Sequence, residues 1–471
     1  MTQSINELLR RLSADGIECA TDEKSLFAAS LDHMRYSFPP QAVVFAKSAS
    51  DVAQTLRNAN ELDVPVTVRG SGTGCTGGCV PICGGVVLDV SKIDFIEIDP
   101  VARIAHVGAG AITADVDAKA GEYGFFYAPD PSSHKFSSIG GNIACNAGGL
   151  RALKYGNTRE NVLSLKAVLV DGTEITGALP LKKYSFGLNL RDLFIGSEGT
   201  LGVVVEAWLK LLPKPESKTT ALAFFAGDKK AFEGVEKIME SNLSPCILEF
   251  LDAETVSCIR ARNPHMPIPQ NAAAILAEFD DENNARQAEK FVEILSPIAD
   301  AKFAKTSAEA EELWKVRRAA SQSMYELGDS KLSQDIVLPH TALDEFFAYY
   351  KALGRDAKLA TPIFGHAGDG NYHIHFMYDS TDPTARARAV DAMDSAIKKA
   401  VELGGAVSGE HGVGFLKSKY MPLQHTQAEL EIMHSIKKLF DPKNILNREK
   451  VYTPHDIKNL TPLKNIKLPW D

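Results

Sequence analysis

The sequence predicts an α+β protein with at least two domains. Its 471 residues exceed what one hydrophobic core usually supports, and 45% hydrophobic with 24% charged residues is typical of a globular chain. Short apolar runs typical of strands are mixed with segments of helical spacing. A stretch with two prolines and polar neighbours, residues 211–218, separates two groups of such elements. We therefore expect a domain on each side of it.

The first group of elements indicates one α+β domain. Residues 51–62 have helical spacing with Asp51 as the expected N-cap, and residues 64–68 then form a strand that runs into glycines. Three further apolar runs predict strands, and the Asp-Gly-Thr sequence at residues 171–173 predicts a hairpin turn. These runs are residues 86–90, 104–107 and 162–170.

The second group begins after the prolines and contains a repeat. Residues 221–225 read as a strand and residues 228–241 as a helix. A strand at 273–279 and a helix at 281–295 repeat this order, which indicates two βαβ-like halves of a ferredoxin-like layer. Further helices are expected at residues 308–327 and 343–353.

The end of the chain is expected to return to the first domain. Residues 439–447 combine a helix end with a turn, which allows the chain to reverse there. The predicted organisation is therefore a first domain at 1–213, a second at 214–420 and a returning C-terminal segment at 421–471.

Composition excludes several classes of protein. A formal charge of −9 argues against a nucleic-acid or anionic membrane surface as the main partner. Residues 5–12 alternate charges with apolar residues instead of forming the apolar core of a secretory signal, and no apolar run reaches transmembrane length. Seven cysteines, an odd number without a pairing framework, are best interpreted as reduced thiols. These features predict a cytoplasmic protein without a membrane span.

The most informative motif is histidine-rich and lies near the C-terminus. Residues 365–375 read Gly-His-Ala-Gly-Asp-Gly-Asn-Tyr-His-Ile-His, and residues 408–412 read Ser-Gly-Glu-His-Gly. Because side chains alternate along a strand, His373 and His375 are expected on one face, with His366 approaching across the glycine loop. Imidazoles and a carboxylate are ligands of borderline divalent cations. The alternative, left open by these residues alone, is that the histidines only stabilise the loop.

Three glycine-rich segments lie within the first domain. Gly72-x-Gly74-x-x-Gly77 follows a strand as in a dinucleotide fingerprint, but the glycines and proline after it preclude the helix that such a fingerprint requires. A non-helical loop of backbone amides can still hold a pyrophosphate. The other segments are residues 137–149 and 196–202. One glycine cluster alone is usually a turn, whereas three suit a long cofactor with phosphate, ribityl and ring parts.

Together these motifs resemble the vanillyl-alcohol-oxidase-type flavoproteins. Within that group the chain is similar to the FAD-linked D-2-hydroxyacid dehydrogenases, the group of D-lactate dehydrogenase and the glycolate oxidase flavin subunit. Gly365-His366-x-Gly368-Asp369-Gly370-Asn371-x-His373 and residues 408–412 carry the resemblance, which covers nearly the whole chain. It implies a two-part FAD-binding domain and a ferredoxin-like cap domain.

The resemblance also implies which residues bind FAD. In some relatives a histidine of the first loop links covalently to the flavin, and that loop has no histidine here, so FAD is expected to bind non-covalently. Cys75 is the nearest candidate for an unusual link. The implied FAD-binding residues are Arg69, Gly70, Ser71, Gly72, Thr73, Gly74, Gly77, Pro131, Ser132, Ser138, Gly141, Asn142, Gly199, Thr200, Gly202 and Asn447.

Oxidation of a 2-hydroxy acid requires a base, a group that acidifies the hydroxyl, and a holder for the carboxylate, with the Cα hydride passing to flavin N5. By resemblance, a divalent metal (zinc, manganese or iron) is bound by His366, His373 and Glu410, and His411 is the base. The resemblance selects Arg317 as the carboxylate clamp over Arg318, although an arginine on an amphipathic helix is usually solvated. Weaker substrate contacts are Ser321, Lys331 and His375.

The expected reaction is oxidation of D-lactate to pyruvate, with glycolate and D-2-hydroxyglutarate as alternative substrates. Because no NAD fingerprint passes its context test and no cluster-binding set of cysteines is present, an external acceptor must take the electrons. The resemblance points to an iron-sulfur subunit, an electron-transfer flavoprotein or a quinone, and a homodimer is left open. Two rival interpretations are a metal-free oxidase of alcohols or amines with this fold, and a flavin-bearing electron-transfer subunit without turnover of its own.

Overall fold

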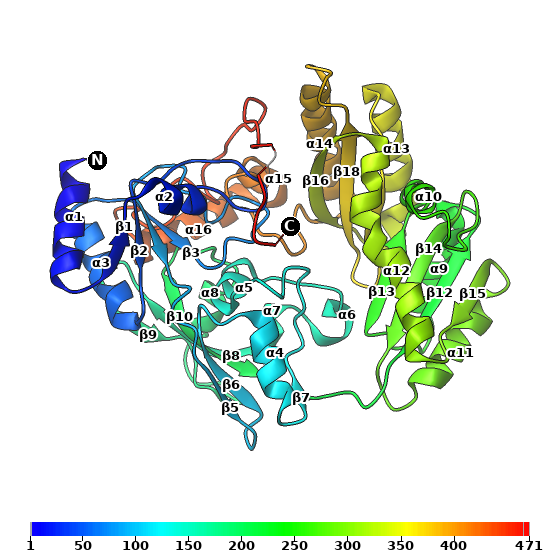
Figure 1. Ribbon diagram of the computed structural model, residues 1–471, viewed down its shortest axis with the longest axis horizontal. Helices are drawn as coiled ribbons and strands as arrows, with labels where there is room; N and C mark the ends of the chain where they lie inside the picture. Colours follow the sequence, from blue (N-terminus) through cyan, green and yellow to red (C-terminus); the bar gives the residue numbers. More distant parts are fainter. Residues whose placement is uncertain (1, 465, 471) are drawn as a thin grey trace. The chain divides into compact units, whose positions relative to one another are not determined.

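The computed structural model describes residues 2–464 and 466–470, and the chain divides into two compact units (Figure 1). Unit 1 comprises Met1–Gly149, Gly156–Lys214 and Glu410–Asp471, and unit 2 comprises Leu150–Tyr155 and Pro215–Gly409. The first division falls one residue after the predicted boundary at 213. The second falls after Gly409, earlier than the predicted boundary at 420, so Glu410 and His411 belong to unit 1. This position has a local cause, because the N–H of Gly409 is held by Asp335 of unit 2 at 2.7 Å.

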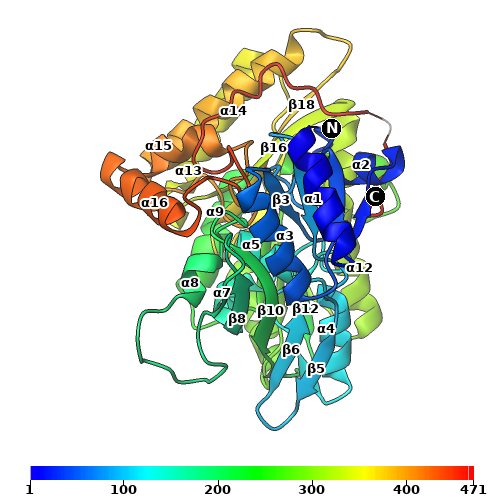
Figure 2. The ribbon, with the colours of Figure 1, turned by 90° about the vertical axis from the view of Figure 1, so that its left-hand side faces the viewer.

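Unit 1 contains two main sheets, as expected for a two-part FAD-binding domain. The first has the order β1-β2-β4-β3, with β2, β4 and β3 parallel and β1 antiparallel. The second is antiparallel, in the order β5-β6-β10-β8-β9. The predicted hairpin at residues 171–173 connects β8 with β9. Helices α1 and α3 lie side by side (Figure 2) and bury their apolar faces in the core of the parallel sheet.

The strands of unit 1 are β1 (Glu18–Ala20), β2 (Ala42–Phe45), β3 (Val66–Arg69), β4 (Val86–Asp89), β5 (Ile96–Asp99), β6 (Ile104–Gly108), β7 (Phe125–Phe126), β8 (Val162–Val168), β9 (Glu174–Thr176), β10 (Val203–Lys210) and β11 (Leu212–Pro213). Its helices are α1 (Gln3–Ala14), α2 (Glu23–Ala29), α3 (Ala49–Glu61), α4 (Thr113–Gly121), α5 (Ile139–Cys145), α7 (Thr158–Asn161), α8 (Arg191–Phe194), α15 (Met421–Gln424) and α16 (Gln427–Phe440), with the 3₁₀ turn η3 (Ser418–Tyr420).

The start of α3 corrects one expectation. The N-cap is Ser48, whose hydroxyl accepts the N–H of Asp51 at 3.1 Å, and Asp51 is the third helical residue. The Asp51 carboxylate in turn accepts the N–H of Lys47 at 2.8 Å. Both residue types favour a helix start, so the sequence located the helix but misplaced its first turn.

The C-terminal segment packs onto the parallel sheet of unit 1, where Leu446 pairs with Val66 of β3. A buried lysine of α16 fixes this return. The Nζ of Lys437 donates to the carbonyl oxygens of Thr200 at 2.8 Å and Leu446 at 2.9 Å. It also pairs at 2.5 Å with Asp441, which is buried and accepts the N–H of Leu446 at 2.7 Å. This charged pair therefore contributes to holding the segment that carries Asn447.

Replacing Lys437 with methionine is expected to lower the free energy of unfolding by about 3–5 kcal/mol, because the Asp441 carboxylate then stays buried without its counter-charge. Urea denaturation of the variant and the wild type measures this difference. Lys438→Met is the matched control, since Lys438 is the next residue of α16 and is exposed. An equal loss of unfolding free energy in the two variants would show that the Lys437–Asp441 pair does not hold the segment.

Unit 2 is built on one seven-stranded antiparallel sheet in the order β15-β12-β14-β13-β17-β18-β16. In chain order the first four strands take the spatial order 4-1-3-2 of a ferredoxin-like layer, and α10 is inserted between the second and third strands. The predicted ferredoxin-like repeat is therefore present in the topology. Helices α10 and α12 cover one face of the sheet, and α9, α11, α13 and α14 cover the other.

The strands of unit 2 are β12 (Thr219–Phe225), β13 (Ile247–Leu251), β14 (Ala273–Phe279), β15 (Ala299–Phe303), β16 (Ser330–Val337), β17 (Ile363–His366) and β18 (Asn371–Tyr378). Its helices are α6 (Ala152–Tyr155), α9 (Asp228–Met239), α10 (Ala253–Arg262), α11 (Asn284–Leu295), α12 (Ser307–Ser323), α13 (Leu343–Ala357) and α14 (Ala385–Glu402), with the 3₁₀ turns η1 (Met324–Leu327) and η2 (His340–Ala342). No helix in the described ranges is both long enough and apolar enough to cross a membrane.

Candidate active site

A cavity of about 300 Å³ in unit 1 is lined by all three glycine-rich segments. The segment from Gly70 to Cys79 runs between β3 and β4, and no helix forms between residues 70 and 85, as the sequence predicted. Most of the predicted FAD-binding residues line this cavity. They are Gly70, Ser71, Gly72, Thr73, Gly74, Pro131, Ser132, Ser138, Gly141, Asn142, Gly199, Gly202 and Asn447.

Three predicted FAD-binding residues are not part of the cavity lining. Arg69 is buried and donates from Nη1 to the carbonyl of Leu31 at 2.9 Å. Gly77 donates its N–H to the carboxylate of Asp32 at 2.7 Å, and Thr200 is fully buried. Their direct contact with FAD stays a prediction.

The cavity suits a cofactor with phosphate groups. Its wall offers backbone amides of the glycine segments and the hydroxyls of Ser71, Thr73 and Ser138, which are donors for phosphate oxygens. A Cβ on Gly70 would lie 2.3 Å from the Ser138 Oγ, so the first two segments approach this closely only because residue 70 has no side chain. The close approach of these two loops at the cavity therefore requires a glycine at position 70.

Buried charges lie beneath the first glycine segment. Lys450 donates from Nζ to the carbonyl of Gly78 at 2.7 Å, and burial lowers the pKa of Lys450 to about 8. Burial raises the pKa of Asp32 to about 6, although the N–H groups of Met34 and Gly77 oppose the rise. The charged groups thus fix the loop from inside, while its outer side faces the cavity.

Gly77→Ala is expected to weaken FAD binding about tenfold. The backbone of Gly77 has φ +77°, which costs an L-residue about 1–2 kcal/mol, and the new Cβ would lie 2.2 Å from the ring of Phe415. Flavin content after dialysis measures the effect. Gly124→Ala is the control, because Gly124 has φ +78° with open space around it and does not line the cavity. Equal flavin loss in both variants would contradict the role of the loop.

Glu198 holds the segment that carries His411 at the cavity wall. Its carboxylate accepts the N–H groups of Val413 at 2.6 Å and Gly414 at 2.8 Å. Thr76 donates from its hydroxyl to the carbonyl of His411 at 3.2 Å. Burial raises the pKa of Glu198, and its two backbone hydrogen bonds oppose that rise. Glu410 and His411 consequently line the same cavity as the glycine segments.

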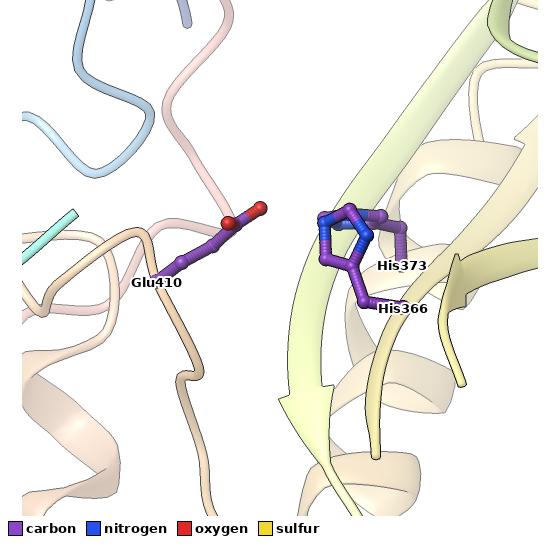
Figure 3. Close-up of side chains that lie close together, drawn as sticks. All are labelled: His366, His373 and Glu410. Carbon is purple, nitrogen blue, oxygen red and sulfur yellow. The ribbon is translucent and has the colours of Figure 1, made fainter. Parts of the chain in front are cut away.

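In unit 2, two histidines lie close together on the neighbouring strands β17 and β18. His366 ends β17 and His373 lies on β18, with ring centroids 5.3 Å apart and an edge-on arrangement. A nitrogen of each ring lies within 4.8 Å of one of the other. Figure 3 shows these two imidazoles next to each other and also draws Glu410. Glu410 follows directly after Gly409, the last residue of unit 2. Two imidazoles at this spacing fit a shared divalent cation.

Glu249 links one of these histidines to the predicted carboxylate clamp. It lies on β13 directly opposite His366 in the strand register, and its Oε1 is 2.5 Å from His366 Nδ1. Arg317 of α12 donates from Nε to the other carboxylate oxygen. Burial would raise the pKa of Glu249, but the charges of His366 and Arg317 hold it below its ordinary value. The carboxylate is therefore ionised between two nitrogen donors.

The ring of Phe364 contacts Arg317 and His375 on this face of the sheet. The guanidinium of Arg317 lies over the Phe364 ring at 4.6 Å, and His375 stacks on the same ring at 5.1 Å. The Nδ1 of His375 donates to the carbonyl of Pro362 at 3.2 Å, and burial together with Lys331 holds the pKa of His375 well below its ordinary value. His375 is thus a neutral imidazole with Nε2 as its acceptor nitrogen.

The remaining predicted substrate residues lie beside the clamp. Ser321 is one helical turn beyond Arg317 on α12, and Lys331 of β16 donates from Nζ to the Ser321 hydroxyl at 3.3 Å. Unit 2 therefore brings the predicted residues Arg317, Ser321, Lys331, His366, His373 and His375 to the α12-covered face of its sheet.

Sequence reasoning missed several residues of these sites. Glu249 has a signal in the sequence, because it is the single charged residue in the apolar run Ile-Leu-Glu-Phe-Leu at 247–251. Glu198 lies in the third glycine-rich segment, but no local pattern indicates the partners of its carboxylate. His33 and Trp470 also line the cavity, and the Nε1 of Trp470 donates to the Nδ1 of His33 at 3.2 Å. No local sequence pattern distinguishes these two residues.

Fold and site together define an FAD-binding oxidoreductase. The chain matches the family "FAD linked oxidases, C-terminal domain" over residues 214–451 and "FAD binding domain" over residues 40–177, and it belongs to the FAD-linked oxidase family. It is an FAD-linked oxidoreductase of the D-lactate dehydrogenase and glycolate oxidase type.

Two relatives and one solved structure support this assignment. The chain is 37% identical over 425 residues to the glycolate oxidase subunit GlcD of Bacillus subtilis, covering 89% of this chain and 90% of the relative. It is 34% identical over 427 residues to a D-lactate dehydrogenase of Anaerostipes hadrus, covering 88% and 89%. A substrate-bound p-cresol methylhydroxylase matches with a TM-score of 0.79 at 15% identity, over 96% and 98% of the chains. This confirms the vanillyl-alcohol-oxidase-type fold.

Proposed function

We propose that this protein oxidises a D-2-hydroxy acid with non-covalently bound FAD and a divalent cation, zinc, manganese or iron. D-lactate, which would give pyruvate, is the first candidate, and glycolate and D-2-hydroxyglutarate are the alternatives. The names of the relatives, a D-lactate dehydrogenase and a glycolate oxidase subunit, support this class of substrate. The electrons would pass to an external acceptor, such as an iron-sulfur subunit, an electron-transfer flavoprotein or a quinone.

One observation carries the proposal: Arg317 and His366 share the buried carboxylate of Glu249, and the His366 ring adjoins that of His373. A planar cation suited to a carboxylate thus lies beside a pair of imidazoles suited to a metal. A 2-hydroxy acid has both functions on adjacent carbons. Glu410 would complete the set of metal ligands. It follows directly after Gly409, which is the last residue of unit 2, the unit that carries His366 and His373.

When bound, FAD supplies the two-electron acceptor, and a divalent cation supplies the positive charge that lowers the pKa of a hydroxyl. Arg317 would hold the substrate carboxylate, while Ser321, Lys331 and His375 would line its surroundings. His411 is proposed as the base that takes the hydroxyl proton, since it lines the cavity of unit 1 and follows the proposed ligand Glu410.

A panel of D- and L-2-hydroxy acids assayed with an artificial dye acceptor tests the proposal. We expect turnover with D-2-hydroxy acids, loss of turnover with a chelator, and recovery when the metal is restored. Anaerobic bleaching of the flavin by the same acids tests the alternative of a flavin-bearing subunit without turnover. The flavin of such a subunit would keep its colour. Turnover of alcohols or amines that survives chelation would favour the metal-free oxidase.

A further inference from the structure

We propose that Glu249 is a positioning residue that orients His366 and Arg317 at the same time. This inference rests on the proposed function, because it concerns how the metal ligand and the carboxylate clamp are held. Glu249 is 0% exposed and sits on β13, between the strand that carries His366 and the helix that carries Arg317. It would touch neither substrate nor cation itself.

The contact with His366 fixes which ring nitrogen is available. The Nδ1 of His366 lies 2.5 Å from Glu249 Oε1, so this ring nitrogen is engaged by the carboxylate. The other ring nitrogen, Nε2, is then the one that would meet a cation. The strand register supports this orientation, since Glu249 and His366 face each other across β13 and β17.

The contact with Arg317 fixes the direction of the guanidinium. Glu249 engages Nε, so the Nη1 and Nη2 groups form the edge that a substrate carboxylate can meet with two parallel hydrogen bonds. The face of Phe364 at 4.6 Å restrains the guanidinium plane. Rotation of this side chain would therefore require the loss of a buried, charge-assisted hydrogen bond.

A glutamine at this position cannot satisfy both neighbours. Its amide has one acceptor oxygen and one NH₂ group, so either His366 Nδ1–H or Arg317 Nε–H would face a donor. We expect Glu249→Gln to weaken metal binding about 10- to 100-fold, as loss of an outer partner of a metal ligand typically does. The KM for the 2-hydroxy acid should rise about tenfold as well, because the clamp loses its anchor.

Glu278→Gln is the matched control. Glu278 lies on the adjacent strand β14, is also buried, and contacts the same helix through Trp314 Nε1 at 3.2 Å. Its charge is paired with Lys218 at 2.9 Å. A general effect of removing a buried carboxylate from this face would appear in both variants, whereas the proposed role predicts an effect only at Glu249.

The full-length holoprotein is dialysed against metal-buffered Zn²⁺ or Mn²⁺ solutions, and bound metal and FAD are measured together with kcat, KM and the melting temperature. Weaker metal binding and a raised KM in Glu249→Gln, with FAD unchanged and Glu278→Gln normal, support the proposal. Metal affinity and KM equal to wild type overturn it. Glu249→Asp, which keeps the charge but is shorter, should give an intermediate metal affinity. It replaces Glu249→Gln in this test if the glutamine variant does not fold. A wild-type protein that takes up no cation and oxidises no 2-hydroxy acid removes the proposed function, and the inference with it.

Discussion

Replacing His373 with alanine is expected to abolish oxidation of 2-hydroxy acids while FAD stays bound. His373 is a proposed ligand of the cation, and a bound cation contributes several kcal/mol to such a reaction, so turnover should fall at least about 1000-fold. The residues that line the proposed FAD cavity lie in unit 1, whereas His373 lies on β18 of unit 2. Its side chain is only half-buried, so the sheet should tolerate the smaller residue.

Three measurements on one preparation test this prediction: flavin content, bound metal and turnover with a dye acceptor. His265→Ala is the control, because His265 belongs to the same unit and is exposed. The expected result is full flavin, lost metal and lost turnover in the His373 variant only. Normal turnover in that variant would refute the metal role, and loss of flavin would show that residue 373 acts on folding or on the cofactor.

The features predicted well from the sequence are those set by local periodicity. Alternation along a strand was enough to place His373 and His375 on one face, and both now lie on the α12 side of the sheet. The glycine and proline content after Gly72 was enough to exclude a helix, and the loop has none. In both cases neighbouring residues contain the information.

What escaped prediction depends on pairing between distant segments. Glu249 and His366 are 117 residues apart, and only the pairing of β13 with β17 brings them together. A strand register of this kind is set by the hydrophobic faces of the whole sheet, which a single segment does not reveal. The start of the return to unit 1 at Glu410 also depends on a distant residue. The carboxylate of Asp335 accepts the N–H of Gly409, so Gly409 stays in unit 2.

Arg317→Met is expected to lower kcat/KM about 100- to 10,000-fold, mainly through KM. Two hydrogen bonds from a guanidinium to a substrate carboxylate would be lost, each contributing about 1.5–3 kcal/mol. The substitution also leaves the Glu249 carboxylate buried without one partner. Arg317→Lys separates these effects, because it retains the positive charge beside Glu249 but lacks the planar fork, so its kcat/KM should lie between methionine variant and wild type.

The neighbouring arginine provides the decisive comparison for this clamp. Successive residues of a helix face different directions, and Arg318 is exposed and pairs with Glu311 instead of contacting the sheet. Arg318→Met should therefore keep wild-type KM and kcat, although it removes the same charge from the same helix. If the two methionine variants raise KM equally, the substrate is attracted by general positive charge on α12. A rise confined to Arg317 requires a directed contact with the substrate, and only that result fits a guanidinium held by Glu249 and Phe364.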